Sequence, residues 1–163
     1  MTAKEYNNGW SLWADDVMRF AVRVCNNRAE CEDAVQEALA ALWQHRGEVP
    51  EAKGKGYLIS VAYRQLMRSF RHPSVRLDSV EALPLLQPQQ PDTAFDTREA
   101  IEQALRTLPE VQRAVLQLRD VEGYTYRDIA NTLDLNENQV QVYLFRARVA
   151  MRKQLKTMGY DEY

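Results

Sequence analysis

Apolar residues recur every three or four positions along most of the chain, and no stretch alternates strictly between apolar and polar residues. The first pattern is typical of amphipathic helices, whereas alternation would indicate β-strands. We therefore predict an all-α protein. The expected helices lie near residues 8–26, 29–46, 51–71, 93–107, 109–121, 125–133 and 137–157.

A proline-rich segment interrupts this pattern in the middle of the chain. Proline cannot continue a helix because it lacks an amide donor and clashes with the preceding turn. We predict two small helical domains, at residues 1–72 and 93–163, joined by a linker at 73–92. The linker also contains apolar residues, so two interpretations remain open: it packs on a domain, or it threads through a partner.

The C-terminal domain carries the signals of a helix-turn-helix. Thr107, Thr125 and Asn136 each place a side-chain oxygen at an expected helix start, with an acid or amide three residues later. This is the spacing of the capping box, which satisfies the free backbone N–H groups of a first helical turn. A short turn then joins the last two helices, as in modules that place their second helix in the DNA major groove.

A projection of the last helix separates an expected buried stripe from an exposed face. The stripe consists of Val140, Leu144, Ala147, Met151 and Leu155. The opposite face combines amides, an arginine and apolar side chains, which suit base edges and thymine methyl groups. We predict DNA contacts from Asn138, Gln139, Gln141, Val142, Phe145 and Arg146. Arg148 lies nearer the core, where we expect a salt bridge or a phosphate contact. Packing of this face on another protein is the alternative.

Net charge is −2 overall, but the charges are arranged in blocks. Residues 51–76 carry a net charge of +5 and residues 136–158 a net charge of +4, whereas the rest of the chain is acidic. Two basic blocks indicate two separate contacts with a polyanion. The first block interleaves basic and aromatic side chains, a combination typical of single-strand binding. Its candidate contacts are Lys53, Tyr57, Tyr63, Arg64, Arg68 and Arg71, with Lys55 extending the same surface.

The helix expected at 29–46 has two contrasting faces. One is an apolar stripe that we expect to be buried, made of Ala34, Val35, Ala38, Leu39, Leu42 and Trp43. The other face is polar and acidic, with Asp33, Gln36, Glu37 and Gln44; its first three residues are called the acidic ridge below. From the pattern alone, this ridge is either a solvated face or a contact surface for a partner.

Several functional classes are disfavoured by the sequence. No apolar run approaches the roughly 20 residues of a membrane span, and the N-terminus lacks the apolar core of a signal peptide. We therefore expect a cytoplasmic protein without membrane insertion. Cys25 and Cys31 have no metal-binding spacing, which favours two reduced cysteines and predicts no metal or other cofactor. No catalytic constellation is convincing, so an enzyme is not expected.

Two segments resemble one protein family. Residues 31–43, CEDAVQEALAALW, are similar to the region 2 signature of bacterial extracytoplasmic-function (ECF) sigma factors, and residues 56–71 resemble the segment that follows it. Residues 108–155 resemble region 4 of the same family. Region 4 alone is shared with other helix-turn-helix regulators, whereas both regions in this order are specific. The resemblance covers roughly residues 8–71 and 93–157.

The resemblance implies a function and partners. Asp33, Gln36 and Glu37 would dock on the clamp helices of the RNA polymerase β′ subunit, and the polymerase β subunit would also be a partner. The basic helix 51–71 would melt and hold the −10 promoter element, and the last helix would read the −35 element. The linker would thread the polymerase cleft, and an inhibitory anti-sigma factor is a possible partner. Arg64 and Arg68 stand where the family often has Asn and Asp, which leaves the −10 base preference undefined.

Two rival hypotheses remain at this point. A stand-alone helix-turn-helix regulator would need a dimerisation surface for paired half-sites, and it leaves the acidic ridge unexplained. An adaptor that binds only proteins leaves both basic blocks unexplained. The sequence does not name the promoter sequence, the inducing signal or the surface that an anti-sigma factor would use.

Overall fold

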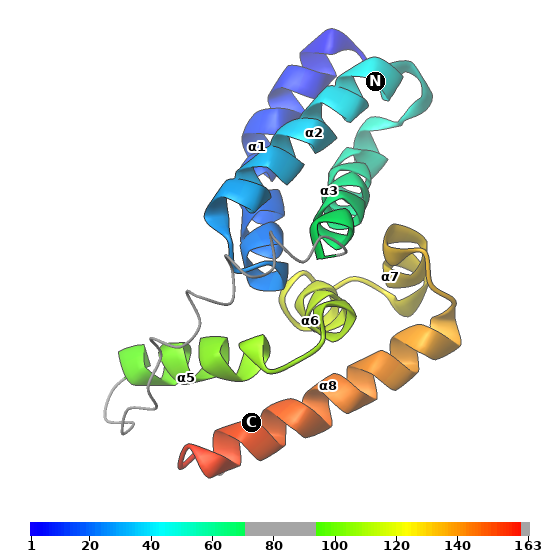
Figure 1. The fold of residues 1–163 in the computed structure, drawn as a ribbon. Coiled ribbons are helices and arrows are strands. Elements are labelled where there is room, and N and C mark those ends of the chain that lie inside the picture. Colours follow the sequence, from blue (N-terminus) through cyan, green and yellow to red (C-terminus); the bar gives the residue numbers. More distant parts are fainter. Residues whose placement is uncertain (71–93, 161–163) are drawn as a thin grey trace.

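The structure is a computed structural model that describes residues 1–70 and 94–160. Figure 1 shows helices throughout these two stretches, and neither contains a strand, which confirms the all-α prediction. The N-terminal half (residues 1–70) contains α1 (Ala3–Val24), α2 (Arg28–His45), η1 (Arg46–Glu48), η2 (Glu51–Lys53) and α3 (Gly54–Phe70). The C-terminal half (residues 94–160) contains α5 (Ala94–Arg106), α6 (Glu110–Leu116), η3 (Gln117–Val121), α7 (Tyr126–Leu133) and α8 (Glu137–Thr157).

The N-terminal half is a bundle of α1, α2 and α3 around an apolar core. Phe20 of α1, Leu42 of α2 and Leu58 of α3 are almost fully buried within it. The first helix begins five residues earlier than predicted because Thr2 caps it: its hydroxyl accepts from the Glu5 amide, and the Glu5 carboxylate accepts from the Thr2 amide. This capping box satisfies two amides of the first turn.

Two glycines allow α1 and α3 to approach closely. The ring of Trp13 lies against Gly9 of its own helix and against Gly54, the first residue of α3. A Cβ atom at either glycine would lie within 2.5 Å of a Trp13 ring carbon, so no larger residue fits without movement of the ring. This contact fixes the start of α3, and with it the positions of Lys55 and Tyr57.

The C-terminal half forms its core where α6, α7 and α8 meet. Leu118, Ile129 and Met151 are fully buried there. Thr125 and Asn136 cap α7 and α8 through their side chains, as predicted, and Asn136 forms a complete capping box with Gln139. The prediction for Thr107 is wrong. Its hydroxyl donates to the Ala104 carbonyl at the end of α5, and Pro109 occupies the cap position of α6.

Two turns of unusual backbone geometry shape this half. After α6 the helix widens into the π-helical turn η3, in which the Glu122 amide donates to the Gln117 carbonyl at 3.1 Å, and Gly123 then adopts a φ of 72°. Asp134 ends α7 with a φ of 57°, a left-handed conformation that asparagine and aspartate tolerate better than most residues. Asp134 thereby makes the short turn of the helix-turn-helix.

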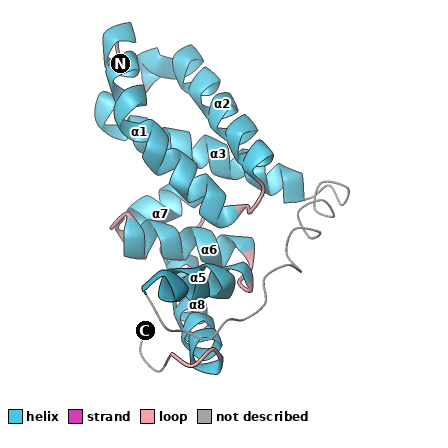
Figure 2. Ribbon diagram, turned by 90° about the vertical axis from the view of Figure 1, so that its left-hand side faces the viewer, coloured by secondary structure: helices cyan, strands magenta, loops and turns pink. Residues whose placement is uncertain are grey.

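The two halves pack against each other. Helix α1 contacts α6, and α3 contacts α7. Figures 1 and 2 show α6 and α7 next to the N-terminal bundle, with α8 on their far side. The predicted linker at 73–92 lies outside the described residues, so its two interpretations and the exact domain boundaries stay predictions.

Candidate nucleic-acid and polymerase interfaces

Helix α8 presents an exposed face with the composition predicted for nucleic-acid binding. Its buried residues are Val140, Leu144, Ala147, Met151 and Leu155, which is the predicted stripe. The six candidate contacts, Asn138, Gln139, Gln141, Val142, Phe145 and Arg146, are all exposed. Phe145 is 70% exposed, and the exposed apolar residues Val142 and Val149 lie about one helical turn before and after it. Neighbouring exposed apolar residues of this kind commonly mark an interaction site. Because α8 lies away from the N-terminal bundle, this face remains open in the packed structure (Figure 1).

Arg148 differs from these residues in the way predicted. Its guanidinium group forms a salt bridge with Asp120 of η3 at 2.6 Å, and its side chain is 41% exposed. The bridge joins α8 to the turn before α7. Arg148 therefore supports the helix-turn-helix framework, whereas Arg146 points to solvent.

The candidate contacts on the basic helix are only partly brought together. Lys53 and Tyr57 line one wall of a groove, and Arg64 and Arg68 are exposed farther along α3. Arg71 lies outside the described residues. Tyr63 contradicts the expectation of an exposed ring: it is 7% exposed and packs near Phe20, with ring centroids 6.5 Å apart. Burial, with smaller contributions from Glu110 and Tyr143, raises the pKa of Tyr63 to about 12.

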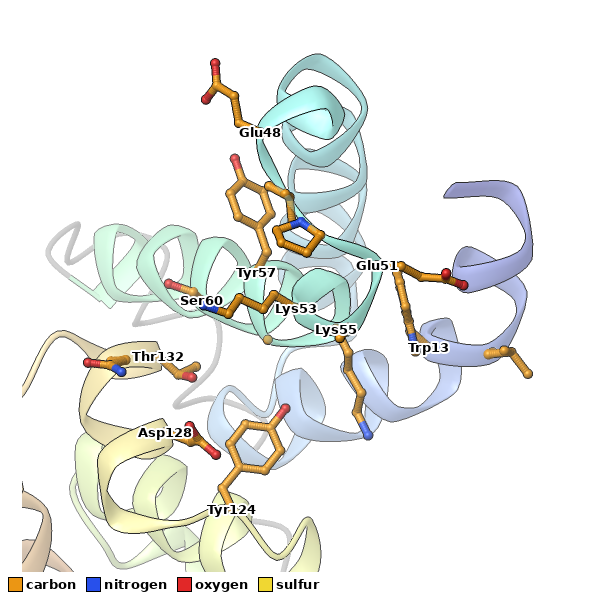
Figure 3. A pocket seen from close by; sticks show the side chains of 16 residues that line it. Trp13, Glu48, Glu51, Lys53, Lys55, Tyr57, Ser60, Tyr124, Asp128 and Thr132 are labelled. Carbon is orange, nitrogen blue, oxygen red and sulfur yellow. The ribbon is translucent and has the colours of Figure 1, made fainter. Parts of the chain in front are cut away.

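The groove lies between the two halves of the chain (Figure 3). It encloses about 920 Å³. The N-terminal half contributes Lys53, Tyr57 and Ser60, and the C-terminal half contributes Tyr124, Asp128 and Thr132. The wall opposite the basic residues is thus made by α7 and the turn before it.

The acidic ridge lies on the exposed face of α2. Asp33, Gln36 and Glu37 all point to solvent, opposite the buried residues Ala34, Val35 and Ala38. The stripe is buried as predicted except at Trp43, which is 41% exposed. Trp43 lies near the end of α2, beyond the core. The Tyr6 ring packs edge-on against it, with ring centroids 5.0 Å apart, and the Arg46 guanidinium carbon lies 3.7 Å from the centroid of the Trp43 ring.

An ion cluster that is not among the sequence-based predictions joins the halves beside the groove. The Glu122 cluster consists of Asp16, Arg19, Lys55 and Glu122. The Glu122 carboxylate accepts from Arg19 at 2.7 Å and from Lys55 at 3.1 Å, while Asp16 accepts from the same two cations at 3.0 and 2.7 Å. No local spacing signals these contacts, because Glu122 is 103 and 67 residues from its partners.

The cluster favours the charged forms of Lys55, Asp16 and Arg19. Burial alone would lower the pKa of Lys55, but the hydrogen bonds to Asp16 and Glu122 outweigh it and raise the pKa above its usual value. The hydrogen bond from Lys55 lowers the pKa of Asp16, and the bond to Glu122 raises the pKa of Arg19. All three shifts favour ionised groups at neutral pH.

The cysteines and other metal-ligand residues do not form a site in the described parts of the chain. Cys25 and Cys31 are buried and not disulfide-bonded. The Cys25 thiol donates to Glu30 at 3.0 Å, and the Cys31 thiol donates to the Cys25 carbonyl at 3.1 Å. Within residues 1–70 and 94–160 there is no group of three histidine, cysteine or carboxylate side chains placed to hold a metal ion.

Comparison with known proteins identifies the family. Residues 11–74 match the family described as Sigma-70 region 2, and residues 98–151 match Sigma-70 region 4. The chain is also 32% identical to the ECF RNA polymerase sigma factor SigL of Mycobacterium tuberculosis, over 86% of this chain and 83% of that protein. This chain belongs to the ECF family of RNA polymerase sigma factors. A second relative, the ECF sigma factor SigM of Bacillus subtilis, is 22% identical, over 88% of this chain and 90% of that one.

The fold of this sigma factor is also similar to a solved structure. The sigma factor RpoE of Bartonella quintana, determined in complex with the anti-sigma factor NepR, superposes with a TM-score of 0.75 at 19% sequence identity. The superposition covers 94% of this chain and 98% of that one. Among the helices that the structure describes here, none is long and apolar enough to cross a membrane.

Proposed function

We propose that this sigma factor binds core RNA polymerase and places it on a subset of promoters through three separate surfaces, without catalysis of its own. The observation that carries this proposal is that one chain exposes both surfaces suited to DNA and a surface suited to a protein partner. The amide, arginine and apolar face of α8 suits duplex DNA, and the acidic ridge of α2 suits a basic protein partner. A stand-alone regulator would need only the first.

The last helix is proposed to read the −35 element in the major groove. Gln141 can form paired hydrogen bonds with adenine, and Arg146 can do so with guanine. Val142 and Phe145 offer apolar contact to thymine methyl groups. Asn138 and Gln139 lie in the first turn, where Gln139 also caps the helix and is therefore less free to reach a base.

The basic surface of α3 is proposed to hold the −10 element as a single strand. Lys53, Arg64 and Arg68 would contact phosphates, and Tyr57 would offer its ring to an unstacked base. Tyr63 is not included, because its ring is buried in the described structure. Arg71 remains a candidate by sequence alone.

The acidic ridge is proposed to dock on the clamp helices of the polymerase β′ subunit. Asp33 and Glu37 lie one turn apart on the same face of α2, so both can meet one basic surface. Assembly with polymerase implies a cytoplasmic location, a second contact with the β subunit and passage of the linker through the polymerase cleft. An anti-sigma factor is proposed as a further partner, since RpoE was solved with one.

The test is run-off transcription with purified bacterial core polymerase on a library of randomised promoters. The proposal predicts transcripts that depend on both proteins and that share two conserved elements. The same protein without core polymerase should give none. Transcription that is no more selective than with core polymerase alone would overturn the proposal.

A further inference from the structure

Glu122 reaches the N-terminal half because of the backbone that precedes and follows it. The π-helical turn η3 adds an extra residue to the helix, and Gly123 reverses the chain directly afterwards in a left-handed conformation. The Glu122 side chain is only 5% exposed, and each of its carboxylate oxygens accepts from a different cation. Charge-assisted hydrogen bonds are stronger than neutral ones, so this buried carboxylate makes a strong contact between the two halves.

Both cations belong to the half that carries the −10 surface. Lys55 lies in the basic block, two residues from Lys53 and from Tyr57, and all three line the groove. The Glu122 carboxylate therefore accepts a hydrogen bond from the Lys55 ammonium group, as a DNA phosphate oxygen would. The groove itself is lined by other acids, Glu48 and Glu51 of the N-terminal half and Asp128 on the opposite wall (Figure 3).

The packed arrangement does not suit simultaneous contact with both promoter elements. Their positions differ by about 25 base pairs, or roughly 85 Å of duplex at about 3.4 Å per base pair. A compact chain of this length has a radius of gyration of about 15 Å. The two halves must therefore separate before α3 and α8 reach their separate elements, and the Glu122 cluster must then break.

We propose that Glu122 is an autoinhibitory latch: it holds the free sigma factor closed and covers Lys55, which contacts the phosphates of the melted strand once the halves separate. The DNA part of this proposal rests on the proposed function. The closed state itself does not, because it depends only on contacts within the chain. Arg23 with Glu102, at 2.9 Å, and Arg113 with the Val24 carbonyl, at 2.7 Å, are further contacts across the same boundary.

The test compares the full-length protein with Glu122→Gln, which keeps the shape of the side chain and removes its charge. Asp120→Asn is the matched control, because it removes a carboxylate two residues away whose partner, Arg148, lies in the same half. Small-angle X-ray scattering at low salt measures the radius of gyration, and circular dichroism confirms that helix content is unchanged. We expect expansion with Glu122→Gln and none with Asp120→Asn.

Fluorescence anisotropy with a labelled single-stranded DNA of mixed sequence provides the second measurement. Glu122→Gln should bind on the order of tenfold more tightly than the wild-type protein, equivalent to about 1.4 kcal/mol. The control should bind like the wild type. If Glu122→Gln folds poorly, Arg19→Gln breaks the same ion pair from the side of the half-exposed arginine. It should also increase the radius of gyration.

The outcomes separate the latch from the proposed function. An unchanged radius of gyration in both Glu122→Gln and Arg19→Gln overturns the latch, whatever the protein does in transcription. Expansion without tighter binding overturns the assignment of Lys55 as a covered phosphate contact. If the wild-type protein fails in run-off transcription but Glu122→Gln still increases the radius of gyration, the proposed function is contradicted and the latch is supported.

Discussion

The guanidinium group of Arg113 donates two hydrogen bonds to the backbone carbonyl of Val24, at 2.7 Å from Nη2 and 3.1 Å from Nε. Val24 is the last residue of α1, where carbonyl groups have no partner within the helix. Arg113 belongs to α6, so a cation of the C-terminal half caps a helix of the N-terminal half. The same guanidinium also donates to the Leu108 carbonyl at 2.7 Å.

Replacement of Arg113 by alanine should weaken this boundary. The change leaves the carbonyls of Val24 and Leu108 without their donor, and hydrogen bonds to charged groups are worth roughly 1.5–3 kcal/mol each. We expect a loss of about 2 kcal/mol in the free energy of unfolding, measured by urea denaturation. Arg127→Ala, at an exposed position of α7, is the control and should cost less than about 0.5 kcal/mol. Equal losses for the two variants would show that the Arg113 contacts are not important.

The acidic ridge should be needed for polymerase binding. Asp33→Lys combined with Glu37→Lys reverses the charge of the ridge, while the buried face of α2 is unchanged. We expect loss of co-purification with core polymerase and retained binding to duplex −35 DNA. Asp15→Lys combined with Glu48→Lys makes the same charge change at exposed positions away from the ridge and should leave co-purification intact. If the ridge variant still co-purifies, the docking assignment is wrong.

The buried Tyr63 should make stability sensitive to alkaline pH. Its pKa is about 12 in the folded protein, against about 10 in an unfolded chain. The contribution of Tyr63 to the free energy of unfolding is therefore complete below pH 10 and is lost as pH rises toward 12. In this range the Tyr63 hydroxyl ionises easily only in the unfolded chain. The expected loss is on the order of 2–3 kcal/mol, measured by denaturation at a series of pH values.

Tyr63→Phe should remove that part of the pH dependence, since phenylalanine has no ionisable hydroxyl. Tyr57→Phe is the control: Tyr57 is less buried than Tyr63, and its replacement should leave the alkaline loss in place. An identical pH profile for wild type and Tyr63→Phe would mean that another group causes the alkaline loss.

Arg64 should matter for opening DNA more than for duplex affinity. Arg64 is exposed on α3, beyond the groove, where it can follow the backbone of a melted strand. We expect Arg64→Ala to reduce transcription from duplex promoters and to regain activity on templates that are already melted at the −10 element. A defect of the same size on both templates would exclude a role in melting.

Periodicity predicted the helices and the buried stripe of α8 because both depend on local spacing. It also separated Arg148 from Arg146, since their positions on the helix differ by 200°. It failed where a neighbour decides the outcome. Tyr63 belongs to the predicted exposed surface but is buried, because Phe20 of α1 packs near its ring. Trp43 belongs to the predicted buried stripe but is exposed, because the core ends before it.

Long-range charge contacts were also beyond the sequence. Glu122 was one of eleven acids in a block between residues 77 and 135, with nothing to distinguish it. Only the three-dimensional fold brings Glu122 to Arg19 and Lys55. Thr107 shows the opposite failure: the local capping signal was present, but proline at position 109 takes the cap position and the hydroxyl bonds backwards to α5.

Promoter selection by Arg146→Ala, in run-off transcription with core polymerase on a randomised library, tests most directly whether α8 reads the −35 element. We expect the wild-type protein to select two conserved elements. The variant should lose preference at one −35 base pair, at a cost of about 1–3 kcal/mol, and keep the same −10 element. A uniform loss on all sequences would make Arg146 a phosphate contact. Selection of a −35 element unchanged in sequence and strength would contradict the assignment of α8 as the reading helix.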